Sequence, residues 1–178
     1  TKKGRVAPTD RSNIVTGVFQ ANPRGFGFVR PEGADKSRDS DIFISAYNTS
    51  GAINEDLVQV KIIRKAGRGS SDNDEGSIVR ILEHRLKSVS GTLYELSSRI
   101  RGINSNFYVH PDNEKVAFDI LIPETEIVTC PPGSKVEVEI TGYPDGDGPA
   151  WGKIIEIFGE ADTFGAAYSA ILYDNDII

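Results

Sequence analysis

Residues 24–30 read Arg-Gly-Phe-Gly-Phe-Val-Arg, and this stretch is the most informative one in the chain. On a β-strand, side chains alternate between two faces. Arg24, Phe26, Phe28 and Arg30 therefore share one face. A core strand would not place arginine at both ends of its apolar face, and a solvent-facing strand rarely carries two phenylalanines. The pattern is typical of a surface that stacks nucleobases on flat rings and holds phosphates with cations.

A second strand is predicted at residues 41–44, which read Asp-Ile-Phe-Ile. If Ile42 and Ile44 point inward, Phe43 points outward and can join the two aromatic rings of the first strand. Phe19, on the preceding strand, is a further candidate for stacking. The competing interpretation is that these phenylalanines are core residues, and it carries most weight at Phe19.

The chain repeats itself, which indicates tandem duplication of a unit of just under 80 residues. Residues 17–19 resemble 91–93, 28–31 match 108–111, 41–44 match 119–122, 58–62 match 136–140, and 76–81 match 152–157. Apolar and polar residues alternate in 58–62 and in 136–140, which predicts half-buried strands. Ile78 and Ile81 break this alternation, so we expect a bulge or bend there.

Five short strands per unit, separated by turn-rich segments, predict an all-β protein with two tandem five-stranded barrels. Closure into a barrel removes the exposed edges of so small a sheet. A short C-terminal helix is expected within residues 162–172, where apolar residues recur at helical spacing. The predicted organisation is a flexible basic arm at 1–12, a first barrel at 13–84, a second barrel at 87–160 and a helical linker at 161–178.

The net charge of −6 hides a difference between the two halves. Residues 1–90 hold 15 Lys and Arg against 11 Asp and Glu, whereas residues 91–178 hold 5 against 15. Only the first half therefore has the basic character that favours a polyanion. No apolar run is long enough to predict a membrane span, and the single Cys130 cannot form an internal disulfide. Both features favour a cytoplasmic protein.

Residues 24–29 resemble the first ribonucleoprotein motif of cold-shock domains, and residues 41–45 resemble the second. Ser45 stands where that family usually has histidine, and Phe19 where it has an exposed tryptophan. The order of both units is similar to the tandem cold-shock region of the ribonuclease R family, within the ribonuclease II enzymes, and the similarity covers about residues 14–172. The resemblance implies OB-fold barrels next to a processive, hydrolytic 3′-to-5′ exoribonuclease domain that requires Mg²⁺.

The resemblance also implies that a cluster of aspartates in the catalytic domain holds the metal. No such cluster, and no pairing of a nucleophile with a base, is visible in this sequence. We therefore expect no catalytic residue and no metal site here. The chain is expected to bind single-stranded RNA, without cutting it, and to guide it to a covalently attached catalytic domain, while Mg²⁺ belongs to that domain.

The predicted RNA-binding residues come mainly from the first unit, which we expect to supply most of the affinity. They are Phe19, Arg24, Phe26, Phe28, Arg30 and Phe43, with Tyr108 and His110 from the second unit. Two basic clusters are expected to contact phosphates, one formed by Lys36 and Arg38 and one by Arg64, Lys65 and Arg68. Two other functions stay open: a free-standing nucleic-acid chaperone of the cold-shock type, and a pair of barrels that binds protein through the acidic second unit.

Overall fold

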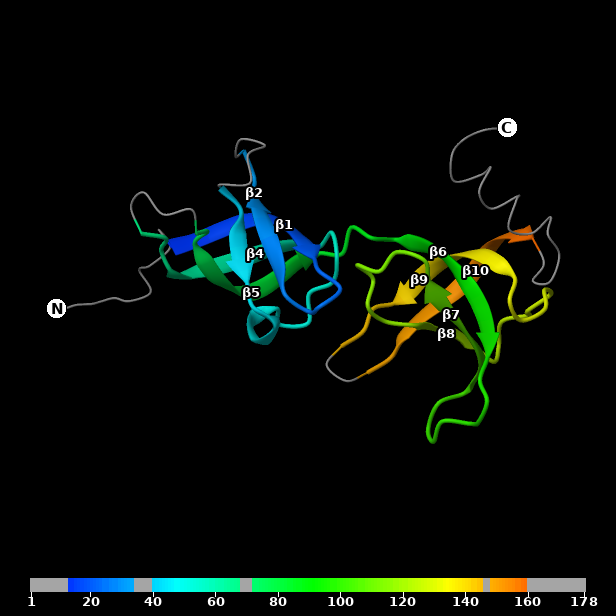
Figure 1. Ribbon diagram of the computed structural model, residues 1–178. Helices are drawn as coiled ribbons and strands as arrows, with labels where there is room; N and C mark the ends of the chain where they lie inside the picture. Colours follow the sequence, from blue (N-terminus) through cyan, green and yellow to red (C-terminus); the bar gives the residue numbers. More distant parts are fainter. Residues whose placement is uncertain (1–12, 34–39, 68–71, 146–147, 160–178) are drawn as a thin grey trace, which may run out of the picture. The chain divides into compact units, whose positions relative to one another are not determined.

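The computed structural model describes residues 13–33, 40–67, 72–145 and 148–159. The chain divides into two compact units, unit 1 from Thr1 to Leu86 and unit 2 from Lys87 to Ile178. Each unit is a closed five-stranded β-barrel, which confirms the predicted fold class (Figure 1). The arm expected at 1–12 and the helix expected near the C-terminus lie outside the described residues. In the part of the chain that the structure describes, no helix has the length and apolar character needed to cross a membrane.

The two barrels have the same topology. Unit 1 consists of β1 (Ile14–Ala21), β2 (Gly27–Pro31), β3 (Ile42–Ile44), the 3-10 turn η4 (Ala46–Asn48), β4 (Leu57–Arg64) and β5 (Glu75–Glu83). Its closed strand order is β1-β2-β3-β5-β4. Unit 2 consists of β6 (Ser88–Glu95), β7 (Ser105–Pro111), β8 (Ile120–Pro123), β9 (Lys135–Gly142) and β10 (Ala150–Gly159), in the order β10-β8-β7-β6-β9. The predicted duplication is therefore present in the order of the strands as well as in the sequence.

Alternating side chains build the core of each barrel. In β4, Val58 and Val60 are fully buried, whereas the side chain of Gln59 between them is only partly covered. The equivalent valines of β9, Val136 and Val138, are also fully buried. Because successive residues of a strand face opposite sides, a sequence with this period of two specifies which side chains of each strand face the core.

Glycines allow the barrels to close. The third and fifth strands of each unit pair in parallel, through Ile44 and Gly76 in unit 1 and through Ile120 and Ala150 in unit 2. A Cβ at Gly76 would collide with Val60, and a Cβ at Gly152 would lie 2.6 Å from Ile120 Cγ2 and 2.7 Å from Val138 Cγ1. The fifth strand can approach its neighbours this closely only where it lacks a side chain.

The bulge expected near Ile78 is confirmed, and it recurs in unit 2. Residue Val79 is skipped in the pairing of β4 with β5, and Ile155 is skipped in the pairing of β9 with β10. Both side chains are about half exposed as a result. A bulge adds local twist to the strand, which helps a long fifth strand to bend around a small barrel.

Replacing Gly152 by alanine should lower the free energy of unfolding of unit 2 by about 1–3 kcal/mol, because the added methyl group overpacks the core. Urea unfolding followed by the fluorescence of Trp151, the only tryptophan in the chain, reports on this unit. Gly142→Ala is the matched control, since a Cβ at this position would have Trp151 Cβ as its nearest contact, at 3.3 Å. Equal losses in both variants would contradict the close-approach argument.

Candidate nucleic-acid interface

Three phenylalanine rings meet on the outside of unit 1, and we call this cluster the aromatic face. Phe28 on β2 and Phe43 on β3 are direct cross-strand partners, with ring centroids 5.6 Å apart. Phe26 lies 5.8 Å from Phe43 and 6.3 Å from Phe28. All three side chains are half-buried, while Ile42 and Ile44 on either side of Phe43 are in the core. The predicted outward orientation of Phe43 is thus confirmed.

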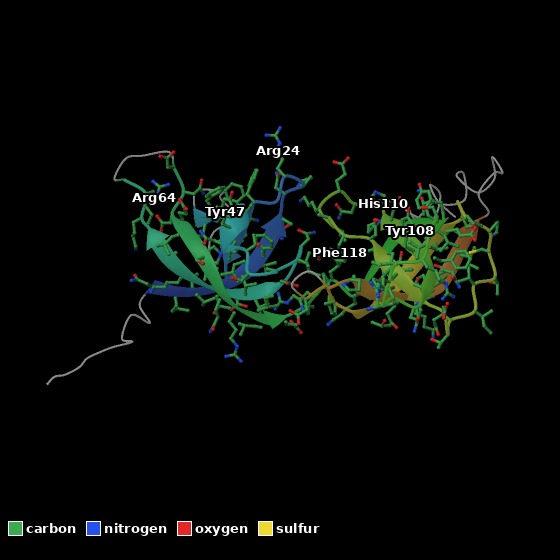
Figure 2. All side chains as sticks on the ribbon, turned by 90° about the horizontal axis from the view of Figure 1, so that it is seen from below. Arg24, Tyr47, Arg64, Tyr108, His110 and Phe118 are labelled. Carbon is green, nitrogen blue, oxygen red and sulfur yellow. The ribbon has the colours of Figure 1, made fainter. Side chains whose placement is uncertain are left out.

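A tight turn between β1 and β2 positions Phe26 and Arg24. The backbone N–H of Asn22 donates to the carbonyl of Phe26 at 2.8 Å, and the N–H of Gly25 donates to the carbonyl of Asn22 at 2.9 Å. The Asn22 side chain also accepts a hydrogen bond from the Arg24 N–H. Gly25 has a φ of +102°, a conformation that favours glycine. The turn leaves Arg24 projecting into solvent (Figure 2).

Phe19 does not belong to the aromatic face, so the prediction that it stacks on RNA is wrong. Its side chain is only 1% exposed and forms part of the core of unit 1. A Cβ at Gly27 would lie 2.6 Å from Phe19 Cζ, which shows that this glycine leaves room for the ring. Leu93, the equivalent residue of unit 2, is also fully buried. The position is therefore a core position in both barrels.

Arginines surround the aromatic face. The guanidinium of Arg30 donates to both carboxylate oxygens of Asp41, from Nε at 3.1 Å and from Nη2 at 3.3 Å. These hydrogen bonds and the adjacent negative charge raise the pKa of Arg30 above its ordinary value. Arg64 pairs in a similar way with Glu75, at 3.1 Å.

The other basic residues predicted to contact phosphates are Arg24, Lys65, Lys36, Arg38 and Arg68, and the structure describes only the first two. Arg24 and Lys65 are exposed and form no ion pair within the described residues. Lys36, Arg38 and Arg68 lie outside the described residues. A cleft of about 290 Å³ adjoins the aromatic face, and Phe28, Phe43, Arg64, Asp72 and Asn73 line it. Flat rings, a guanidinium and an open cleft thus occur together at one place on unit 1.

Unit 2 carries a different arrangement at the equivalent strands. Tyr108 on β7 stacks on Tyr94 on β6, with ring centroids 5.4 Å apart and an interplanar angle of 24°. Nδ1 of His110 lies 2.7 Å from Asp119 Oδ1, which repeats the Arg30–Asp41 pair of unit 1 with a weaker base. Leu121 is 7% exposed, and it stands where β3 of unit 1 has the half-buried, outward-facing Phe43.

Sequence reasoning missed Tyr94, which is 42% exposed. Its equivalent in unit 1 is Gln20, so comparison of the repeats gave no signal at this position. Strand alternation would have found it, since Leu93 next to it is buried and successive side chains face opposite sides. Tyr47, which is 97% exposed in η4, was also missed and lies just beyond β3.

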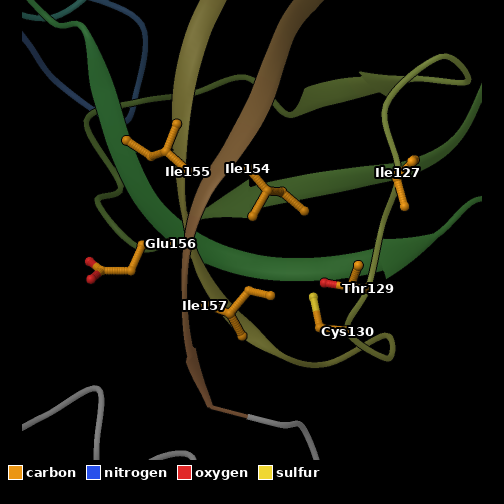
Figure 3. A pocket seen from close by; sticks show the side chains of 7 residues that line it. All are labelled: Ile127, Thr129, Cys130, Ile154, Ile155, Glu156 and Ile157. Atoms are coloured by element: carbon orange, nitrogen blue, oxygen red, sulfur yellow. The ribbon is translucent and has the colours of Figure 1, made fainter.

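Within the described residues, no three His, Cys, Asp or Glu residues lie close enough together to hold a metal ion, so the Mg²⁺ of an exoribonuclease domain does not fit these residues. The buried Cys130 lies in an apolar groove with Ile127, Ile154 and Ile157, while Glu156 points away from it (Figure 3).

Two family models match this chain, one in each unit. Residues 17–81 match the model described as the ribonuclease B OB domain, and residues 108–178 match the model described as the cold shock domain. Ribonuclease R 1 of Lactococcus lactis is 30% identical over 190 residues, and the match covers the whole of this chain. The chain spans only 22% of the length of that relative.

Solved structures with the same fold include RNase R of Mycoplasma genitalium in complex with ribose-methylated single-stranded RNA. The TM-score is 0.68 at 19% identity, and the match covers 92% of this chain and 24% of the other. Yeast Ssd1, a pseudonuclease, has a TM-score of 0.65 at 17% identity, with 98% of this chain and 27% of the other covered. At these identities the likeness establishes the fold alone.

Truncating Phe19 to alanine should lower the free energy of unfolding of unit 1 by about 3–5 kcal/mol, because it opens a cavity in the core. Phe19→Leu, which introduces the residue found at this position in unit 2, should cost much less. Phe26→Ala is the surface control and should also cost less than the core truncation. Hydrogen exchange of unit 1 peptides, measured by mass spectrometry, separates these cases. If Phe19→Ala lowers the free energy of unfolding no more than Phe26→Ala does, Phe19 is not a core residue.

Proposed function

This chain belongs to the OB and cold-shock region of the ribonuclease R family, and we propose that it binds single-stranded RNA, chiefly through the aromatic face of unit 1. The observation that carries the proposal is the contact of three half-buried phenylalanine rings on the outer surface of β2, β3 and the preceding turn. Rings buried only in part keep area for stacking, and a stacked base contributes about 1–3 kcal/mol. An unpaired strand offers such bases, whereas a duplex keeps them stacked inside.

The arginines around these rings support the same proposal. Arg30 uses two of its N–H donors on Asp41, which holds the planar guanidinium in place and leaves further donors for a phosphate. Arg64 is held by Glu75 beside the cleft that Phe28 and Phe43 line. A single strand of RNA would run across β2 and β3, with its bases stacked on the rings and its phosphates bound by the guanidiniums.

Within a longer protein of this family, the aromatic face would hold RNA on its way to an exoribonuclease active site. The names of the relatives and the share of their length that the chain spans support this role. Hydrolysis and its Mg²⁺ would then belong to the catalytic domain, and the units described here would contribute affinity and direction. A chain of units 1 and 2 alone should leave bound RNA intact.

Replacing Phe28 or Phe43 by alanine should weaken binding of a short single-stranded RNA about fivefold or more, because each variant loses a stacking surface. Fluorescence anisotropy with labelled RNA measures the dissociation constant, and matched duplex RNA tests the preference for single strands. Val79→Ala, an exposed truncation at the bulge of β5, is the control in the same barrel. Unchanged affinity in both phenylalanine variants would place the RNA site elsewhere.

Arg24→Gln should reduce the dependence of RNA affinity on salt. Each phosphate contact with a single strand contributes about 0.7 to the slope of log K against log salt concentration, so the slope should fall by roughly that amount. Anisotropy titrations over a salt series give the slope. Lys61→Gln removes the same charge from the exposed side of β4 and should leave the slope unchanged. Equal changes in both variants would indicate a general effect of net charge.

A further inference from the structure

Unit 2 has a cleft of about 500 Å³ beside the stacked tyrosines, and we call it the unit 2 cleft. Its apolar lining comes from the segment between β6 and β7, from β7 and β8, and from Pro149 just before β10. The residues that line it are Glu95, Leu96, Ser97, Ile100, Ile103, Tyr108, Asp119, Leu121 and Pro149. Ile100 is 44% exposed at its edge, and Tyr108 is held from β6 by stacking on Tyr94. An exposed apolar hollow with an aromatic wall is typical of a binding surface.

The charged residues that line the unit 2 cleft differ from those that line the cleft beside the aromatic face. Both charged residues that line the cleft, Glu95 and Asp119, are carboxylates. Asp119 is paired with His110, whose Nδ1 lies 2.7 Å from Asp119 Oδ1. Arg99, from the same segment as Ile100, is engaged by Glu124 at 2.9 Å and does not line the cleft. In unit 1 the corresponding cleft has one basic and one acidic residue in its lining, Arg64 and Asp72.

This arrangement disfavours a phosphate and favours a cation. An RNA strand that entered the cleft would bring its phosphates towards two carboxylates in a half of the chain that holds 15 acidic and 5 basic residues. A guanidinium or ammonium group, by contrast, would be attracted by the carboxylates and by the face of a tyrosine ring. Apolar neighbours of that cation would cover Ile100, Ile103 and Leu121.

We propose that the unit 2 cleft binds an extended protein segment in which arginine or lysine alternates with apolar residues. The basic side chain lies between Tyr108 and the carboxylates of Glu95 and Asp119, and the apolar side chains fill the remainder of the cleft. Duplication has then produced two barrels with different partners, a polyanion on unit 1 and a basic protein segment on unit 2. This site is distinct from the aromatic face, since the two lie on separate units, and it assigns to a protein segment the residue Tyr108, which the sequence predicted as an RNA contact.

The test uses the full 178-residue chain and a short fluorescein-labelled peptide of alternating arginine and leucine. Fluorescence anisotropy at physiological salt should show saturable binding, and a peptide of alternating glutamate and leucine should not bind. Tyr108→Ala and Glu95→Gln should each weaken binding about fivefold, through loss of the cation–π contact and of one carboxylate. Ile100→Ser, at an exposed position that tolerates a polar residue, should weaken it without affecting the fold.

Matched controls separate a built site from general attraction to an acidic protein. Glu139→Gln removes the same charge from an exposed position on β9 outside the cleft and should leave the affinity unchanged. Tyr108→Phe keeps the aromatic ring and should retain binding. Equal weakening by Glu95→Gln and Glu139→Gln would overturn the proposal, as would no binding of the basic peptide.

Labelled single-stranded RNA provides the remaining arm of the experiment. Glu95→Gln and Ile100→Ser should bind RNA with unchanged affinity, because neither residue is among the predicted RNA contacts and the aromatic face of unit 1 is intact in both variants. If Tyr108→Ala weakens RNA binding and leaves peptide binding unchanged, the cleft is a second RNA surface and the proposal is wrong. If RNA fails to bind to any version of the chain while the peptide result stands, the proposed RNA function fails and the peptide site does not.

Discussion

The parallel pairing of the third and fifth strands is the contact on which each barrel depends. It spans two residue pairs, Phe43 with Glu75 and Ile44 with Gly76 in unit 1, and Ile120 with Ala150 and Leu121 with Trp151 in unit 2. Without it, the sheet would keep two open edges, which a five-stranded protein of this size must avoid. Glycines near this pairing allow the backbones to approach, and a bulge in the fifth strand supplies the bend. Because the barrel is closed, the outward-facing side chains of its first three strands form one curved surface.

That outer surface and the core are two sides of the same strands. Val29 is fully buried and Phe28 next to it faces outward, and in β3 two buried isoleucines enclose Phe43. A shift of register by one residue would exchange the core for the aromatic face, so the hydrophobic core determines which rings reach the surface. The glycines of the ribonucleoprotein-like motif have a structural task as well, because Gly27 leaves space for the buried ring of Phe19.

The two units show how far a shared fold leaves function open. Both have the same strand order, a basic residue paired with an aspartate at equivalent positions, and aromatic residues on their second strands. They differ in the side chains around these features, since the unit 1 cleft is lined by Arg64 and Asp72 and the unit 2 cleft by the carboxylates Glu95 and Asp119. The same fold also occurs in a pseudonuclease, so the architecture does not decide the chemistry of a protein that contains it. The proposed functions therefore rest on the charged groups and aromatic rings that each unit places on its surface.

Strand alternation and repetition in the amino-acid sequence predict the class of fold, the duplication, the bulge near Ile78 and the outward position of Phe43. The same patterns did not place Phe19 in the core, although an aliphatic residue, Leu93, stands at the equivalent position of the repeat. Tyr94 was missed for the opposite reason, since nothing aromatic corresponds to it in unit 1. Only the tertiary structure decided that Arg30 and Arg64 are held by carboxylates and that a carboxylate-lined cleft adjoins Tyr108. Such contacts join residues on different strands, and their distances follow from how the barrel closes, which no local pattern specifies.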